Sequence, residues 1–207
     1  FSKHYLSYID YFDVVGYFFL LLNFLLLLFL TIKKPHLKDI LIIFLLIRVL
    51  LCFINVEIFS LPDSAGDAFK FIRIASEMSD KGLYENIVNP EFGKYFKHSY
   101  SWFLAILFSI FGESYLLAAS LSISLGLLTI FFFDDLLKLL WGNQNFNRVI
   151  FLTTLIPSLT LYSVLPLREV VFVFTLLMAF INAGKYLEYN NYKYLIFSVI
   201  FFFITGT

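Results

Sequence analysis

Long apolar runs separated by short polar stretches dominate the hydrophobic pattern of the chain. A transmembrane helix needs about 20 consecutive, mainly apolar residues, and five runs approach that length. The run at 99–112 is too short for a typical span and predicts an interfacial or re-entrant helix. The predicted spans are residues 14–32, 40–60, 115–133, 148–165 and 170–187, and a sixth begins in the run 194–207. The pattern predicts an all-α fold, a polytopic transmembrane helical bundle in one domain over residues 1–207, with a loop at 61–113 inserted between spans.

Three residues interrupt the predicted spans. Asn23 is strongly polar, and Arg48 lies in the middle third of its span. Charges at such depth usually face the bundle interior or a cavity, so Arg48 is expected either to snorkel or to pair with another helix. Pro157 has no amide hydrogen and predicts a kink in the span 148–165.

Basic residues favour one orientation of the bundle. Short loops rich in Lys and Arg tend to stay in the cytoplasm. Placing the basic connections inside puts the N-terminus, the loop 61–113 and the turn at 166–169 outside, provided that 99–112 does not cross. The protein is then expected in the plasma (inner) membrane, with its long loop facing the outside or periplasm. The inner basic residues are Lys33, Lys34, Lys38, Lys138, Arg148, Lys185 and Lys193.

Composition supports the membrane interpretation. Apolar residues make up 60% of the chain and charged residues 14%, against about 45–50% and about 25% in soluble domains. These values argue against a soluble enzyme, a disordered tail and a nucleic-acid partner, and fifteen basic residues balance fifteen acidic ones. The single cysteine, Cys52, permits no internal disulfide. Because the sequence starts at Phe1 and its last apolar run is short, we expect it to be a piece of a longer protein.

The polar segment 61–98 holds the first group of candidate residues. Ser64 and Asp67 match a capping box, which predicts a helix from about Asp67 to Met78. Its apolar face would carry Phe71, Ile74, Ala75 and Met78, and its charged face Lys70, Arg73 and Glu77. One interpretation is an interfacial amphipathic helix with a solvated charged face. In the other, the Asp67 carboxylate accepts a proton from a hydroxyl nucleophile, with Asp63 as a substitute acid, and Lys70 and Arg73 neutralise a phosphate.

Arg168 and Glu169, at the start of a span, form the second group. An acid in the first turn of a helix is common because it complements the helix dipole, which is the structural interpretation. In the functional interpretation, Glu169 faces Asp67 across an outer cavity and Arg168 binds an anion. His98 ends the polar loop, and a lone histidine is more often structural than a ligand. The pair Asp134-Asp135 is interpreted as a helix end on the inner side, and no zinc or nucleotide motif is present.

Several short motifs along residues 40–187 occur in a familiar order. They are Gly66-Asp67-Ala68-x-x-Phe71-x-x-x-Ala75, Phe111-Gly112, Trp141-Gly142, Pro157-Ser158-Leu159-x-Leu161-Tyr162-Ser163 and Leu167-Arg168-Glu169. Together they resemble the N-terminal half of GT-C glycosyltransferases, membrane enzymes that use polyprenyl-phosphate sugars. The protein O-mannosyltransferase and aminoarabinose-transferase branch is the most similar. The sequence departs from the family in having His98-Ser99 in place of His-Pro and Asp67-Ala68 in place of Asp-Glu.

The resemblance implies an inverting glycosyltransferase with a polyprenyl-phosphate-linked sugar as donor. It gives Asp67 and Glu169 catalytic roles, and it places Arg168, Arg73, Lys70 and His98 as candidates for binding the substrate phosphate. The leaving group is already an anionic phosphate, so the chemistry requires no cofactor, although two carboxylates are compatible with a divalent metal. The bilayer and the lipid-linked donor are the expected partners, and the acceptor is left open.

Three other classes stay open from the sequence. A polysaccharide polymerase or ligase of the O-antigen type also has a large outer loop and places Arg and Glu near outer helix ends. A non-enzymatic transporter would line a water-filled path with Arg48 and Asn23 and would carry interrupted helices in paired positions. The third class is a membrane protein in which these residues have only a structural, scaffold role.

Overall fold

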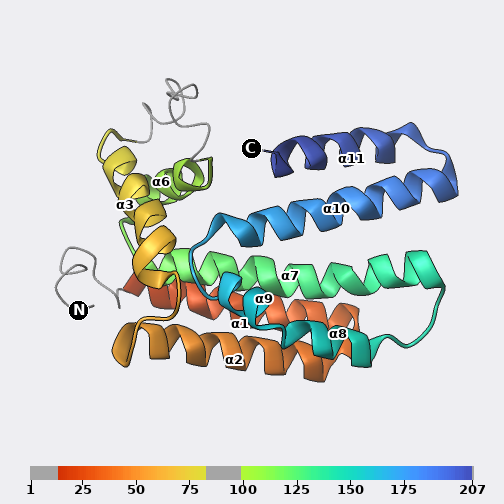
Figure 1. Cartoon of the computed structure of the whole chain (residues 1–207), viewed down its shortest axis with the longest axis horizontal. Helices are drawn as coiled ribbons and strands as arrows, with labels where there is room; N and C mark the ends of the chain where they lie inside the picture. Colours follow the sequence, from red (N-terminus) through yellow and green to blue (C-terminus); the bar gives the residue numbers. More distant parts are fainter. Residues whose placement is uncertain (1–13, 83–98, 207) are drawn as a thin grey trace.

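The computed structural model describes residues 14–82 and 99–206, and the regular elements in these ranges are all helical (Figure 1). The predicted all-α class is therefore confirmed for the described residues. The elements are α1 (Val14–Lys33), η1 (Pro35–Leu37), α2 (Lys38–Glu57), η2 (Ser64–Ala68), α3 (Phe69–Ser79), α6 (Ser99–Phe111), α7 (Tyr115–Trp141), α8 (Asn147–Thr154), α9 (Pro157–Tyr162), α10 (Arg168–Tyr189) and α11 (Tyr192–Thr205).

Three of the described helices, α1, α7 and α10, are long and apolar enough to cross a membrane. The helix α2 has the same length as α1 but carries Lys38, Asp39 and Arg48, and α11 is only 14 residues long. A membrane helical bundle is thus supported by three candidate spans, and the larger number of five to six stays a prediction.

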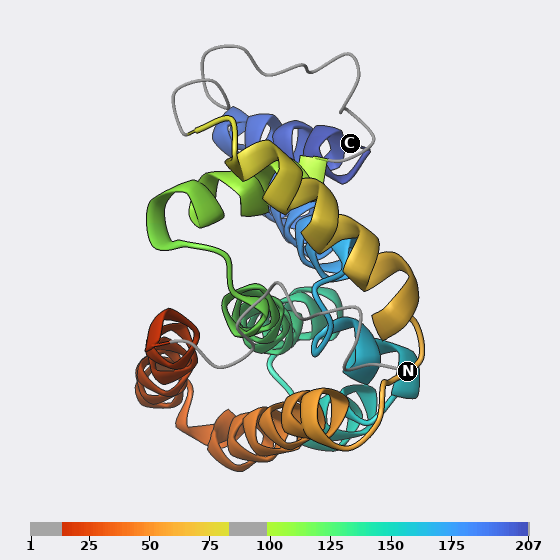
Figure 2. The ribbon, with the colours of Figure 1, turned by 90° about the vertical axis from the view of Figure 1, so that its left-hand side faces the viewer.

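The long helices run side by side and define two ends of the bundle (Figure 1). We call one the turn end, since it carries the connections at residues 34–37, 142–146 and 190–191. The other is the cap end, where η2, α3 and α6 lie across the bundle between α2 and α7, as Figure 2 shows from that side. The basic residues expected inside gather at the turn end. Their grouping on one side of the bundle agrees with the prediction, whereas the sidedness itself stays a prediction.

Helix α7 lies at the centre and contacts α1, α2 and α10. Asn23 on α1 is fully buried and donates to the carbonyl of Ser120 at 3.1 Å, while its own oxygen accepts from the Ser124 hydroxyl at 2.8 Å. Gly126 allows a close approach, because a Cβ there would lie 2.7 Å from Phe44 Cζ and 2.8 Å from Ser163 Cβ. At this point the side chains of Phe44 on α2 and Ser163 at the end of α9 pack directly against the backbone of α7.

Two sequence predictions about helix length are wrong. The span expected at 115–133 continues to Trp141, so Asp134-Asp135 does not end a helix. Asp134 is instead buried, with 1% of its side chain exposed, and its Oδ2 pairs with Lys138 at 2.8 Å, Lys34 at 3.1 Å and His36 Nε2 at 3.2 Å. These partners come from α7 itself and from the α1–α2 connection. The buried carboxylate therefore joins α7 to the α1–α2 connection at the turn end, and because its charge is neutralised by these partners, the helix continues past Asp134.

The second correction concerns the segment 148–165, which is broken rather than kinked. Helix α8 ends at Thr154, and α9 restarts at Pro157 and ends at Tyr162. Ile156 has φ −60° and ψ 121°, the extended conformation that a following proline favours. Pro157 then occupies the first position of α9, where its missing amide hydrogen costs nothing. The break frees backbone carbonyls at the end of α8, and these need other donors.

The ion-pair cluster at the turn end generates a stability prediction. We expect Asp134→Asn to lower the free energy of unfolding by about 3 kcal/mol, because it leaves Lys34 and Lys138 without their shared buried partner. The matched variant Asp135→Asn should cost about 1 kcal/mol or less, because Asp135 is considerably more exposed. Unfolding in mixed detergent micelles measures both. Equal losses for the two variants would contradict the assigned role of Asp134.

Candidate functional site

The cap end gathers four segments that lie far apart in the sequence around one apolar core. Residues of η2 and α3, of α6, of the first turns of α7 and of the connection 164–167 share this cluster. Ala68, Leu104, Leu117 and Leu165 are each fully buried in it. The cluster places Asp67 and the pair Arg168–Glu169 at the same end of the molecule, as the functional interpretation requires.

The turn that carries Asp67 is built differently from the predicted capping box. Asp63 adopts a left-handed conformation with φ 65°, which aspartate tolerates better than most residues. Its carbonyl then accepts the amide of Ala68 at 3.2 Å, closing a π-turn over Ser64–Ala68 with no side-chain cap. The predicted capping box is therefore wrong, and α3 proper starts at Phe69. Such π-turns are frequent at functional sites.

Helix α3 is amphipathic, as the sequence predicts. Phe71, Ala75 and Met78 are buried, Ile74 packs against them, and Ile72 joins the buried face. The charged side is solvated: Arg73 and Glu77 pair at 3.6 Å with 61% and 68% of their side chains exposed, and Lys70 is exposed. An ion pair so exposed contributes little stability. The basic groups therefore stay available to a solvent-side ligand.

Hydrogen bonds that the sequence does not predict fix η2 and α3 onto the bundle. The Asn55 amide donates to the Tyr115 hydroxyl at 2.6 Å and accepts from the Leu61 backbone amide at 2.8 Å. Ser76 on α3 donates to the Glu113 carboxylate at 2.6 Å. These bonds join α2, the chain entering η2, α3 and the start of α7. The cap is consequently tied to the membrane helices at both of its edges.

The two predicted acids share the cap end but differ in environment. Asp67 is exposed and makes no hydrogen bond or ion pair within the described part of the chain, and Asp63 is also exposed. Glu169 Oε1 lies 3.7 Å from Arg168 Nε, whereas Glu169 Oε2 is buried and has no hydrogen-bond partner within residues 14–82 and 99–206. No bond joins Asp67 to Glu169 or to Arg168 in those ranges. His98 lies outside the described residues.

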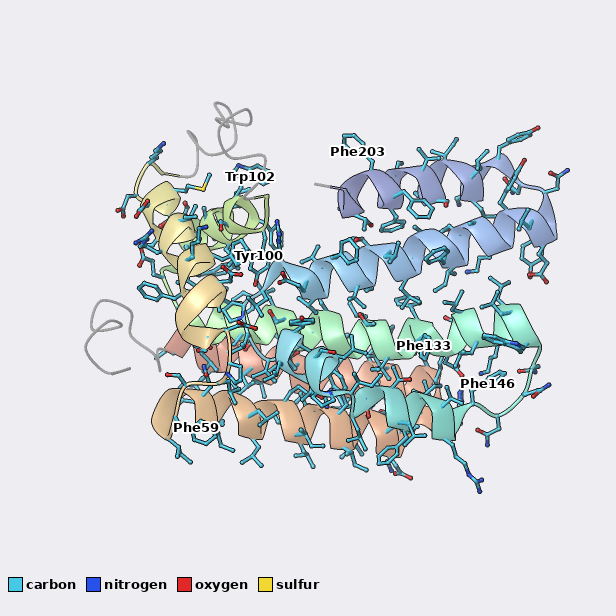
Figure 3. All side chains as sticks on the ribbon, viewed as in Figure 1. Phe59, Tyr100, Trp102, Phe133, Phe146 and Phe203 are labelled. Atoms are coloured by element: carbon cyan, nitrogen blue, oxygen red, sulfur yellow. The ribbon has the colours of Figure 1, made fainter. Side chains whose placement is uncertain are left out.

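Tyr100 on α6 completes this group, and the sequence gives no specific signal for it. Its hydroxyl is buried and, like Glu169 Oε2, makes no well-formed hydrogen bond among the described residues, although the Ser122 side chain lies near it. Burial raises the pKa of Tyr100, the Ser122 side chain offsets part of this rise, and the negative charge of Glu169 adds to it. Figure 3 shows Tyr100 beside the start of α10. A neutral phenol is a hydrogen-bond donor, and the neighbouring carboxylate is an acceptor.

Glu169, Tyr100 and Arg168 therefore present an acceptor, a donor and a cation at one end of the bundle. Arg168 is 59% exposed and can turn toward an anion arriving from solvent or from the membrane interface. Within the described ranges no group of three or more His, Cys, Asp or Glu side chains is placed to hold a metal ion. Comparison of the chain with protein-family models, curated proteins and solved structures found no match.

The unpaired hydroxyl generates a paired stability prediction. We expect Tyr100→Phe to leave the free energy of unfolding unchanged or to raise it by about 1 kcal/mol, because it removes a buried hydroxyl without a partner. The same substitution at Tyr115 should lower it by about 1–3 kcal/mol, because the Asn55 amide loses its acceptor. Thermal unfolding of the purified variants checks the sign. A clear loss of stability in Tyr100→Phe would contradict the unpaired state of this hydroxyl.

Proposed function

We propose that this chain belongs to a membrane glycosyltransferase that moves a sugar from a polyprenyl-phosphate carrier to an acceptor hydroxyl at the cap end. The observation that carries the proposal is the Glu169 carboxylate, whose buried Oε2 lacks a partner beside the unpaired Tyr100 hydroxyl and the Arg168 guanidinium. Unsatisfied buried polar atoms are costly, and binding of a ligand or a role in a reaction is one physical reason for a native protein to keep them.

Each group has a role in this reaction. The acceptor oxygen attacks the anomeric carbon of the sugar, the carbon–oxygen bond to the phosphate breaks, and the polyprenyl phosphate leaves with the bonding electrons. Glu169 accepts the proton of the acceptor hydroxyl, and Asp67 serves as the second carboxylate at the solvent side. Arg168 binds the phosphate, with Arg73 and Lys70 on α3 as further cations. Tyr100 donates a hydrogen bond that orients the bound substrate.

The position of the cap supports a lipid-linked donor. Three candidate membrane spans and the amphipathic α3 support a position of the acids at the membrane interface, where the head of a polyprenyl-phosphate sugar would lie. On α6, Phe103, Ile110 and Phe111 are exposed apolar side chains suited to the same interface. We place the cap end on the outer face of the plasma membrane, in line with the basic residues at the turn end.

The cavity beside Arg48 bears on the transporter alternative. Its lining is mainly apolar, with Phe44, Ile130, Phe133 and Leu177 among its walls. A path for water or ions would need polar groups along its length. Among the described helices, α8–α9 is interrupted, but α1, α7 and α10 are each continuous. We therefore favour the transferase over transport.

The test uses the gene that encodes this chain, deleted and then restored as wild type or variant. Mass spectrometry of lipid-linked sugars should show a monosaccharide-phosphate polyprenol accumulating in the deletion strain. Wild type should remove it, whereas Glu169→Gln should transfer about 100-fold more slowly or worse, because the general base is lost. Asp67→Asn should also be impaired. The matched control, Glu188→Gln, changes an exposed glutamate near the turn end and should behave as wild type.

Three results would contradict the proposal. Accumulation of a diphosphate-linked oligosaccharide would instead indicate a polymerase or ligase. An unchanged lipid pool in the deletion strain, or full rescue by Glu169→Gln, would remove the catalytic assignment. Expression of each variant in the membrane fraction, measured in the same strains, separates lost activity from lost protein.

A further inference from the structure

A second candidate site lies inside the bundle, away from the cap end. A cavity of about 230 Å³ is enclosed by α2, α7, α8–α9 and α10. Gly126 and Phe133 line it from α7, Val173 from α10 and Ser163 from the end of α9; Figure 3 labels Phe133 on α7. The cavity is partly open to the outside, and Phe180, which is 49% exposed, is among the residues that line it.

Arg48 is the one charged residue among those that line this cavity. Its side chain is fully buried, and its guanidinium stacks on the Phe44 ring at 3.8 Å. Nε donates to Ser163 Oγ at 3.2 Å, and Nη2 donates to the Thr154 carbonyl at 2.6 Å and to Thr160 Oγ1 at 3.1 Å. Nη1 has no hydrogen-bond partner in the described part of the chain.

The charge of Arg48 is also uncompensated. Within residues 14–82 and 99–206 its hydrogen-bond partners are neutral, and it forms no ion pair. A buried guanidinium without an anion is costly, because desolvation is not repaid by Coulomb attraction. Arg48 itself lines the cavity, together with Phe44, Thr154 and Ser163, which surround its guanidinium.

We propose that this cavity binds a long-chain fatty acid, with its carboxylate on Arg48 and its chain along the apolar walls. One free nitrogen and one uncompensated positive charge match a single monoanionic head. The apolar lining and the opening at Phe180 match a hydrocarbon chain entering from the bilayer. The proposal is independent of the glycosyltransferase assignment, since it uses no residue of the cap end.

The test uses the purified protein in nanodiscs of zwitterionic phosphatidylcholine. A palmitic acid analogue with a photoreactive diazirine on its chain is crosslinked, and the labelled peptides are mapped by mass spectrometry. We expect labels on the cavity-lining stretches of α7 and α10. Palmitate should displace the probe at least 10-fold better than hexadecanol, which has the same chain but no charge. This comparison uses only the wild-type protein, so it does not depend on the folding of a variant.

A cavity-filling variant supplies the second arm. Val173→Trp places a large side chain in the cavity without touching the hydrogen bonds of Arg48 and should reduce labelling at least 10-fold. Phe172→Trp, on the exposed face of the same helix, is the matched control and should label as wild type. Equal displacement by palmitate and hexadecanol, labels confined to lipid-facing residues, or unchanged labelling in Val173→Trp would each overturn the proposal.

Discussion

A buried guanidinium spans the break between α8 and α9, and the packing of the bundle depends on it. Arg48 reaches from α2 to the freed carbonyl of Thr154 on one side of the break and to Thr160 and Ser163 on the other. Pro157 makes the break unavoidable, because it has no amide hydrogen and forces Ile156 into an extended conformation. The Thr154 carbonyl accepts from Arg48 Nη2 at 2.6 Å and from Thr160 Oγ1 at 3.2 Å, so Arg48 and α9 together satisfy the end of α8. The charge of Arg48 thereby lies at the wall of the cavity between α2, α7 and α10.

The two ends of the bundle use polar groups in opposite ways. At the turn end, Asp134 is surrounded by Lys34, Lys138 and His36, and this dense set of ion pairs holds the connections rigidly. At the cap end, Glu169 is 36% exposed and has one ion pair, a longer contact of 3.7 Å to Arg168, while its Oε2 and the Tyr100 hydroxyl are buried without a hydrogen bond among the described residues. Structural bonds there, such as Asn55–Tyr115, lie beside the acids rather than on them. Ion pairs therefore hold the turn end, where Asp134 Oδ1 is the carboxylate oxygen left without a hydrogen bond, whereas the acids of the cap end carry few structural bonds.

Much of the helical architecture is predictable because apolar length and helical spacing reflect burial directly. The bounds of α1 and α10, the short helix α6 and the two faces of α3 follow from that pattern. The continuation of α7 through Asp134 does not follow from that pattern. It depends on Lys34 and His36, which lie almost 100 residues away in the chain. The sequence predicts Asp67 and Glu169 as candidate acids. It does not predict that Glu169 is less exposed than Asp67 or that Tyr100 lies beside Glu169, because both depend on tertiary packing. Likewise, the sequence leaves Arg48 either snorkelling or paired with another helix, and its burial and its partners across the α8–α9 break come from the structure alone.

Hydrogen–deuterium exchange at the break tests this account most directly. The wild-type protein and Arg48→Lys are compared in nanodiscs by mass spectrometry of peptides covering residues 150–165. Lysine keeps the positive charge, but its single ammonium group on an unbranched stem cannot reproduce the planar fork of a guanidinium. We predict faster exchange in Arg48→Lys confined to the end of α8 and to α9, with α1 and α10 unchanged. Identical exchange over residues 150–165 in the two proteins would contradict the role given to Arg48.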